Sequence, residues 1–168
     1  LVSSSAASDV YKRQAQYIYE DWLLKLESVH RASHLYSTHS GFENYDSNAL
    51  VTGFEYTLYG IQDSSHDLGL IGEYLFDEWQ QITPFQRDWM TGLRWTWNDE
   101  NSTEFLLGHI LDLDDGTQIW QLEASRRLAS AWKLSSTARW STHVDDDNLF
   151  AGQLKDQDQI SIKLDYYF

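Results

Sequence analysis

The stretch that decides the fold is Asp158-Gln-Ile-Ser-Ile-Lys-Leu-Asp-Tyr-Tyr-Phe168, at the end of the chain. Its apolar side chains occupy every second position and finish on an aromatic residue: Ile160, Ile162, Leu164, Tyr166 and Phe168. A period of two gives an extended chain one apolar face and one polar face. The stretch is therefore predicted to be a β-strand with two chemically different faces.

The same ending resembles the C-terminal β-signal of bacterial outer-membrane barrels. The matching positions are Ile162, Leu164, Tyr166 and Phe168, although no glycine precedes them as in the usual pattern. The resemblance implies an antiparallel up-and-down transmembrane β-barrel in a Gram-negative outer membrane. Its implied partners are outer-membrane lipid, lipopolysaccharide and the barrel assembly machinery. The alternative interpretation is an edge strand of a soluble sandwich.

The rest of the chain continues this pattern as period-two segments separated by polar turns. Strands are predicted at residues 22–30, 48–61, 66–77, 88–98, 103–113, 117–128 and 131–143, before the final one. Residues 15–21 are predicted to end a further strand, and Asp114-Asp115-Gly116 to form a hairpin turn with glycine at positive φ. The predicted fold class is all-β, the last eight or nine strands of a larger barrel. The segments have the length that a tilted membrane-spanning strand needs.

Connection lengths support the same interpretation. The connections predicted for the outer side are 144–157, 114–116, 78–87 and 31–47, and those for the periplasmic side are 129–130, 99–102 and 62–65. Three of the first group are long and all of the second are short. Outer-membrane barrels show this asymmetry, with long loops outside and short turns inside.

The beginning of the chain has a different character. Residues 4–14, Ser-Ser-Ala-Ala-Ser-Asp-Val-Tyr-Lys-Arg-Gln, resemble the in-frame translation of a sequencing-library adapter. Such a segment is excluded from reasoning about the fold. Residues 1–14 are therefore expected to be an adapter-derived, disordered artefact. Residues 15–168 are expected to form the C-terminal part of a barrel whose upstream strands are missing.

Composition excludes several classes of function. With 26 acidic and 12 basic residues, the formal net charge of −14 argues against nucleic acid as a partner. No run of 18 apolar residues is present, so no transmembrane helix is expected. Aromatic residues make up 15% of the chain, which fits the interfacial girdles of a barrel. The absence of cysteine permits an oxidising compartment, and neither a cofactor nor a metal is expected.

Charged residues recur on the face opposite the apolar one and are predicted to line a lumen. They are Lys25, Glu27, Arg31, Glu55, Glu73, Asp77, Arg94, Glu104, Asp112, Glu123, Arg127, Lys133, Arg139, Lys163 and Asp165. A wide barrel would make them the wall of a porin-like passive channel for small solutes or ions. A narrow barrel would pair them in a closed, salt-bridged lumen with a structural or adhesive role.

Weaker signals add little to these two functions. Ser141, His143 and the acids 145–147 suggest an outer-membrane esterase or deacylase as a minor alternative, but their order does not match such enzymes, and no enzyme is expected. His109, on the apolar face, is interpreted as an interface residue or a register irregularity rather than a ligand. Residues 122–134 resemble a strand–turn–strand of uncharacterised proteobacterial outer-membrane proteins, which implies the barrel but no substrate.

Overall fold

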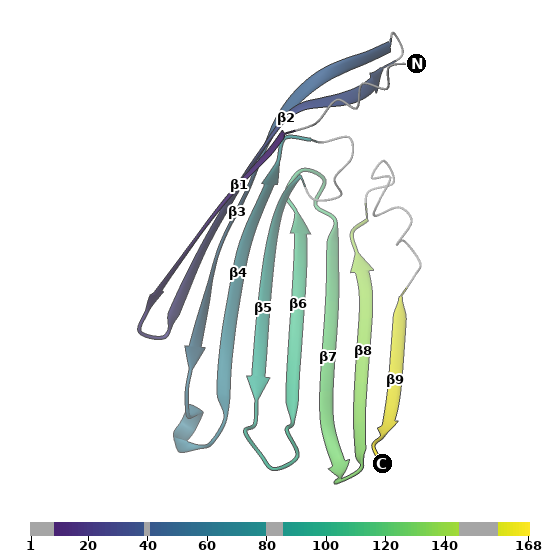
Figure 1. The fold of residues 1–168 in the computed structure, drawn as a ribbon. Helices are drawn as coiled ribbons and strands as arrows, with labels where there is room; N and C mark the ends of the chain where they lie inside the picture. Colours follow the sequence, from purple (N-terminus) through teal and green to yellow (C-terminus); the bar gives the residue numbers. More distant parts are fainter. Residues whose placement is uncertain (1–8, 39–40, 80–85, 145–157) are drawn as a thin grey trace.

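The computed structural model of the chain describes residues 9–38, 41–79, 86–144 and 158–168. Nine strands follow one another across a single antiparallel sheet, in the order of the chain (Figure 1). They are β1 (Asp9–Tyr19), β2 (Trp22–Thr38), β3 (Gly41–Leu58), β4 (Asp67–Asp77), β5 (Arg87–Thr96), β6 (Glu104–Asp112), β7 (Gln118–Ala129), β8 (Trp132–Thr142) and β9 (Gln159–Tyr166). A short 3-10 helix, η1 (Ile61–Asp63), lies between β3 and β4.

The prediction of an all-β, antiparallel, up-and-down sheet is confirmed. Each strand pairs with its neighbours in the chain, and the sheet is open, with β1 and β9 as its edges. The predicted turn at Asp114-Asp115-Gly116 is also confirmed: Gly116 has φ 79°, and its N–H donates to the Asp112 carbonyl at 3.0 Å. Among the described residues, no helix combines the length and the apolar character that crossing a membrane requires.

Strands β2 and β3 are much longer than predicted, and the expected connection at 31–47 is wrong. The two strands remain paired from His34–Tyr45 to Thr38–Gly41, after a register shift between Arg31 and His34. This part of the sequence is polar and lacks period-two alternation, so the sequence did not indicate a strand there. The two strands nevertheless pair through their backbones, and backbone pairing does not require alternating side chains. The extension projects beyond the other strands at the top of Figure 1.

The expectation of disorder over residues 1–14 is wrong for residues 9–14. These residues belong to β1 and pair with β2 in unbroken register. Two contacts to one carboxylate accompany the pairing: Lys12 Nζ lies 2.7 Å from Glu27 Oε1, and Gln14 Nε2 donates to Glu27 Oε2 at 2.6 Å. Residues 1–8 lie outside the described residues.

The sheet has two rims. The C-terminal rim, at the bottom of Figure 1, carries the connections 20–21, 59–66, 97–103 and 130–131, and the opposite rim carries 39–40, 78–86, 113–117 and 143–158. The prediction that long connections lie at one rim and short connections at the other is therefore wrong for two connections. The opposite-rim connection 39–40 is short, and 59–66 is extended by η1, where Gly60 and Gln62 take positive φ.

The connection 97–103 is fixed by one aspartate. Asp99 accepts hydrogen bonds from the Thr103 N–H and from the Thr103 hydroxyl, both at 2.7 Å. Because these bonds favour the charged form, they hold the pKa of Asp99 below its ordinary value. The loop is thus tied by a carboxylate that stays ionised as the pH falls toward its lowered pKa.

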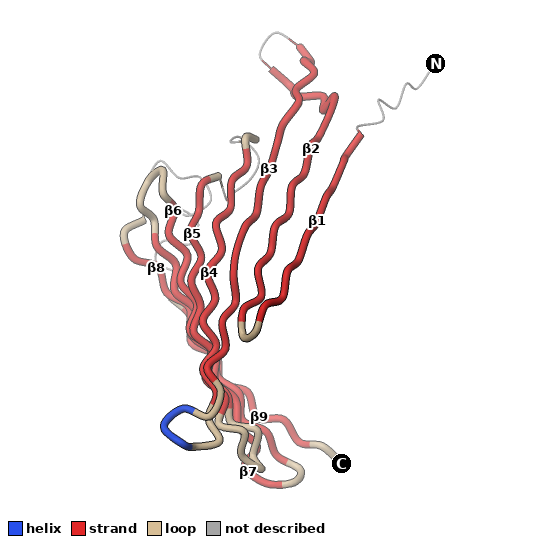
Figure 2. The backbone as a smooth tube through the Cα atoms, turned by 90° about the vertical axis from the view of Figure 1, so that its left-hand side faces the viewer, coloured by secondary structure: helices blue, strands red, loops and turns tan. Residues whose placement is uncertain are grey.

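The sheet has no hydrophobic core among the described residues. The largest fully buried side chains are only Asp88 and Ser47, whereas many Leu, Ile, Tyr and Trp side chains are exposed. The accessible surface is 12077 Å², against about 8,600 Å² for a compact 19.6 kDa protein. Figure 2 shows the reason: the strands form one twisted layer, with β1–β3 diverging from β4–β9 and no second layer packed on either side.

The two faces of the sheet differ completely in β4–β9. Register places every strand aromatic of this region on one side, the apolar face: Tyr74, Phe76, Trp89, Trp95, Phe105, Trp120, Trp132, Trp140 and Tyr166. An unbroken aliphatic row crosses the same face: Leu70, Leu93, Leu107, Leu122, Ala138 and Ile160. No aromatic residue lies on the other side of these strands, which we call the polar face.

Two glycines on β3 and β4 are required by close packing. A Cβ on Gly53 would lie 2.6 Å from Glu73 Cγ and 2.7 Å from the Gly72 carbonyl oxygen, and a Cβ on Gly72 would lie 2.6 Å from the Phe54 ring. In contrast, a Cβ on Gly108 would meet nothing nearer than the Gln121 carbonyl, at 3.8 Å. Gly53 is therefore fixed by backbone contact, while Gly108 is not.

We expect Gly53→Ala to lower the free energy of unfolding by about 1–3 kcal/mol, because the backbone of β4 must move to admit the methyl group. Gly108→Ala, the matched control, should be neutral or slightly stabilising, since it restricts the unfolded chain without a clash. Denaturant unfolding followed by tryptophan fluorescence measures both. Equal losses in the two variants would contradict the packing described here.

Candidate functional site

The polar face is the candidate functional site. Every residue predicted to line a lumen lies on this one face, because register connects them through directly paired positions. One such row runs from Arg94 through Leu106 and Glu123 to Thr137. The alternation read from the sequence therefore assigned these side chains to the correct side of the sheet.

Most charges on the polar face pair with close neighbours. Lys25 Nζ contacts the Glu55 carboxylate and lies 3.9 Å from Glu73 Oε1. Arg31 Nη1 lies 3.0 Å from Asp77, whose side chain is largely buried. These groups lie on β2, β3 and β4, so each cation meets its acids across one or two strands. Toward the other edge, Lys133 lies 3.9 Å from Glu104, and Lys163 lies 2.8 Å from Asp165.

Three arginines of the polar face make no ion pair with an acid among the described residues. Arg139 donates to Gln121 Oε1 at 2.9 Å, and Arg127 lies over the Tyr167 ring at 5.9 Å. Arg94 has neither a hydrogen bond nor a ring contact there, and its side chain is exposed. The face therefore presents three cations whose charge is not neutralised by a neighbouring carboxylate.

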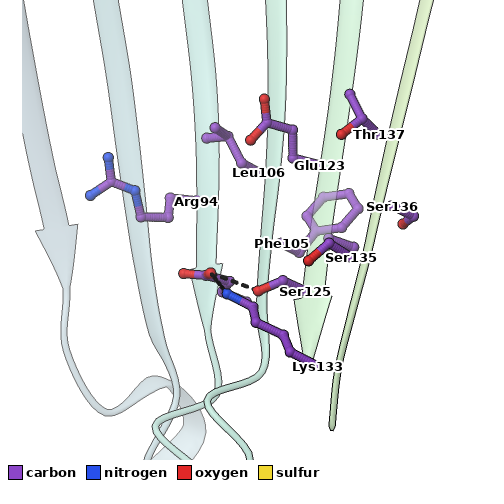
Figure 3. Close-up of a pocket in the computed structure, with 11 residues that line it drawn as sticks. Arg94, Phe105, Leu106, Glu123, Ser125, Lys133, Ser135, Ser136 and Thr137 are labelled. Atoms are coloured by element: carbon purple, nitrogen blue, oxygen red, sulfur yellow. Dashed lines mark hydrogen bonds and ion pairs between the residues drawn. The ribbon is translucent and has the colours of Figure 1, made fainter. Parts of the chain in front are cut away.

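A shallow hollow of 280 Å³ lies over β5–β8 on this face (Figure 3). Its lining combines Arg94, Leu106, Glu123, Lys133, Ser135 and Thr137 with Glu104 and Ser125. The Ser125 hydroxyl donates to Glu104 at 2.7 Å. The Ser135 and Thr137 hydroxyls of the same lining make no side-chain hydrogen bond in the described part of the chain. Figure 3 shows Arg94 at the edge of the hollow, directed away from Glu123.

Asp88 belongs to this face and was missed by the sequence analysis. It is 1% exposed, lies opposite Asp112 in the β5–β6 register, and its Oδ2 has no hydrogen-bond partner. The alternation Asp88–Met90–Gly92–Arg94 in the sequence could have placed it, because Arg94 was already assigned to the polar side. Within the described ranges, no three His, Asp or Glu side chains are arranged to hold a metal ion.

The residues of the weaker predictions are not brought into a catalytic arrangement that can be described. Ser141 lies on the polar face of β8, and His143 follows the strand with φ 57°. The acids 145–147 lie outside the described residues. His109 stacks on Trp120, with ring centroids 4.0 Å apart, and the register of β6 is regular, so the expected irregularity is absent.

The predicted assembly signal lies at the free edge of the sheet. Ile162, Leu164 and Tyr166 point to the apolar face of β9, and each has more than half of its side chain exposed. Phe168 is fully exposed beyond the strand. β9 pairs only with β8, so its other edge is open.

Comparison with known proteins adds no family: no protein-family model, no curated protein and no solved structure matches the chain. The chemistry of the two faces therefore carries the functional argument.

We expect the Lys25–Glu55 pair to be energetically coupled. A double-mutant cycle with Lys25→Met and Glu55→Gln should give a coupling energy of about 0.5–3 kcal/mol, because removing the lysine alone leaves Glu55 and Glu73 facing each other. The exposed Lys12–Glu27 pair is the control and should give less than about 1 kcal/mol. Unfolding measurements on the single and double variants provide both values. A Lys25–Glu55 coupling no larger than that of the control would contradict the cluster.

Proposed function

We propose that the sheet forms part of an outer-membrane β-barrel in a Gram-negative bacterium, which acts as a porin-like passive channel for small solutes or ions. The observation that carries the proposal is the separation of the two faces. In β4–β9 all strand aromatics lie on the apolar face, and almost all charges lie on the polar one. A single layer with an uncovered apolar face needs an apolar surrounding, and lipid provides it.

The dimensions of the apolar face support a lipid environment. Register places Trp89 level with Thr142 of β8, and Trp132 begins that strand ten residues away. This span is about 33 Å along the strand, and the usual tilt of barrel strands reduces it to about 25 Å, the height of an outer-membrane apolar band. Aromatic residues lie toward both ends, and the aliphatic row of Leu107 and Leu122 lies between them, as in two interfacial girdles.

The pairing of charges supports an open lumen. In a closed lumen, bases would be expected to meet acids across the interior, because an unpaired buried ion costs several kcal/mol. Here Lys25, Lys133 and Lys163 find acids on the same wall. Arg94, Arg127 and Arg139 remain without acids in the described residues, a state that water in a channel tolerates.

The second candidate is a closed structural or adhesive barrel. It is favoured by the Lys25–Glu55–Glu73 cluster, whose lysine is held between two acids and whose side chains are each only about 30% exposed. A barrel that places another base against Glu73 would extend this cluster across the lumen. Conductance distinguishes the two candidates, because an open channel conducts ions and a closed barrel does not.

The orientation of the faces predicts where arginine is tolerated. Leu107→Arg and Leu122→Arg should each destabilise the protein in lipid by about 2–4 kcal/mol, because both residues lie midway between the aromatic bands. Leu134→Arg should cost less, since Leu134 pairs with Arg126 near the C-terminal rim. Thr137→Arg, on the polar face, is the control and should be mild. Similar penalties at Leu107 and Thr137 in folding measurements with lipid vesicles would reverse the assignment of the faces.

The channel is tested by conductance. The full-length protein in planar bilayers should conduct ions, and Arg94→Gln, Arg127→Gln and Arg139→Gln combined should shift selectivity toward cations. The physical reason is that the three bases removed have no acid partners among the described residues, so that without them the acids dominate the charge of the lumen wall and attract cations. Lys163→Gln, which removes a base already paired with Asp165, should shift selectivity less.

Absence of conductance in the folded parent would reject the channel. If the triple variant is also strongly destabilised, its arginines pair with acids across a closed lumen, and the structural barrel is the better description.

A further inference from the structure

Apolar side chains interrupt the polar face, most of them nearer to the rim opposite the C-terminal one. They are Ile71 and Leu75 on β4, Met90 on β5, Leu106 and Ile110 on β6, and Ile119 on β7, and we call them the apolar belt. Register makes Met90, Ile110 and Ile119 direct neighbours across three strands. Each belt residue keeps part of its surface exposed. The strands make their substantial contacts only with their sheet neighbours, so no other described strand covers the belt.

Two cations lie beside the belt, nearer to the C-terminal rim than Met90, Ile110 and Ile119. Arg94 is paired in register with Leu106, and it has no partner among the described residues. Arg139 lies one register row from Ile119 and reaches only Gln121. Two acids lie in this region. The Glu123 carboxylate accepts a hydrogen bond from the Gln121 amide, and Glu73 is paired in register with Met90 and lies 3.9 Å from Lys25. Because Glu73 already has a base beside it, the guanidinium groups of Arg94 and Arg139 face one carboxylate that has no base among the described residues, that of Glu123.

The acids on the other side of the belt are not free to bind a cation. Asp88 is 1% exposed, so a solute cannot reach it. Asp112 Oδ1 accepts the N–H groups of Asp114 and Asp115, at 2.8 and 3.3 Å. A cationic amphiphile would therefore have to compete with Lys25 for Glu73, the partly exposed carboxylate opposite Met90. An anionic amphiphile finds the guanidinium of Arg94, unpaired among the described residues, at the end nearer to the C-terminal rim.

The strand positions level with the gap between Arg94 and Met90 leave room for a solute on β6. Gly92 and Gly108 pair directly at this level, and a Cβ placed on Gly108 would meet only the Gln121 carbonyl at 3.8 Å. Over Gly92 the Ile71 side chain is close, 3.3 Å from a Cβ placed there, and adds an apolar contact. Arg94 and Met90 are four residues apart on β5, about 13 Å between their Cα atoms. A long, flexible arginine side chain can cover part of this distance by bending toward Met90, and a carboxylate with a short alkyl chain or a single ring can cover the rest.

We propose that the polar face binds a small amphipathic organic anion, with its carboxylate on Arg94 and its apolar body on Met90, Ile110 and Leu106. Arg139 adds a second positive charge without direct contact. The inference deepens the proposed channel and rests on it, because the solute reaches this face through a water-filled lumen. It assigns the channel a preferred solute class, the apolar monocarboxylates, over inorganic ions and sugars. Sugars lack a stacking partner beside Arg94, since the strands β4–β9 carry no aromatic residue on this face, and the rings of Trp79 and Tyr167 lie beyond the strand ends, against Arg31 and Arg127.

The test is calorimetric titration of the full-length protein, folded in detergent, with sodium hexanoate, acetate and hexylammonium. Hexanoate should bind saturably and more tightly than acetate, by about fourfold for each methylene buried. Hexylammonium should bind more weakly than hexanoate, because the carboxylate opposite Met90, Glu73, already lies beside Lys25. Arg94→Gln should weaken hexanoate binding by about tenfold, Arg139→Gln by less, and Met90→Gln by several-fold. Glu123→Gln should strengthen it, because a competing carboxylate is removed. Arg126→Gln, which removes a cation from the other face, is the control and should leave the affinity unchanged.

Equal affinity for hexanoate and acetate would overturn the site, and so would an Arg126→Gln effect as large as that of Arg94→Gln. Arg94 is exposed, so its variant should fold even where Met90→Gln does not, and its result decides the anchor. Conductance of the same preparations in planar bilayers separates this inference from the channel itself. Conduction without preferential hexanoate binding ends the inference and keeps the channel. Hexanoate binding without conduction keeps the site and ends the channel.

Discussion

The whole structure depends on the fact that one sheet has two faces and no second layer. In a soluble domain the apolar side of a sheet is covered by helices or by another sheet. Here the described residues offer no such cover, and the most deeply buried side chains are an aspartate and a serine. Stability must therefore come from strand pairing and from whatever surrounds the apolar face. The proposal of a lipid surrounding follows from this constraint rather than from any single residue.

The same constraint explains the chemistry of the polar face. Charges there need partners or water, and most of them find partners one or two strands away. In the proposed barrel, such local pairing would neutralise most charges of the lumen wall without any group that fills the lumen. The arginines without acid partners among the described residues would then be available to bind a solute, and the apolar belt beside Arg94 would determine the class of that solute.

Period-two alternation predicted the sheet and the side of each charged residue, because a strand with two different environments leaves that pattern in its sequence. It could not predict the outer halves of β2 and β3, where residues 31–47 have no apolar face to record. It also missed residues 9–14, which pair through backbone and one shared carboxylate, Glu27. The alternation could have assigned Asp88 to the polar face. It could not have predicted that Asp88 is buried, because burial depends on what packs around a residue, and alternation does not encode packing.

The extension of β2 and β3 has a consequence for how the molecule comes apart. Below the register shift at Arg31 and His34, both strands are held inside a wide sheet, whereas above it they hold only each other. A ribbon of two strands is marginal by itself in water. The free energy of local opening must therefore fall from the register shift toward the last described pair, Thr38 and Gly41, so this ribbon frays long before the sheet unfolds. The free energy of opening thus decreases gradually from a sheet that unfolds cooperatively to a two-stranded segment that opens independently of it.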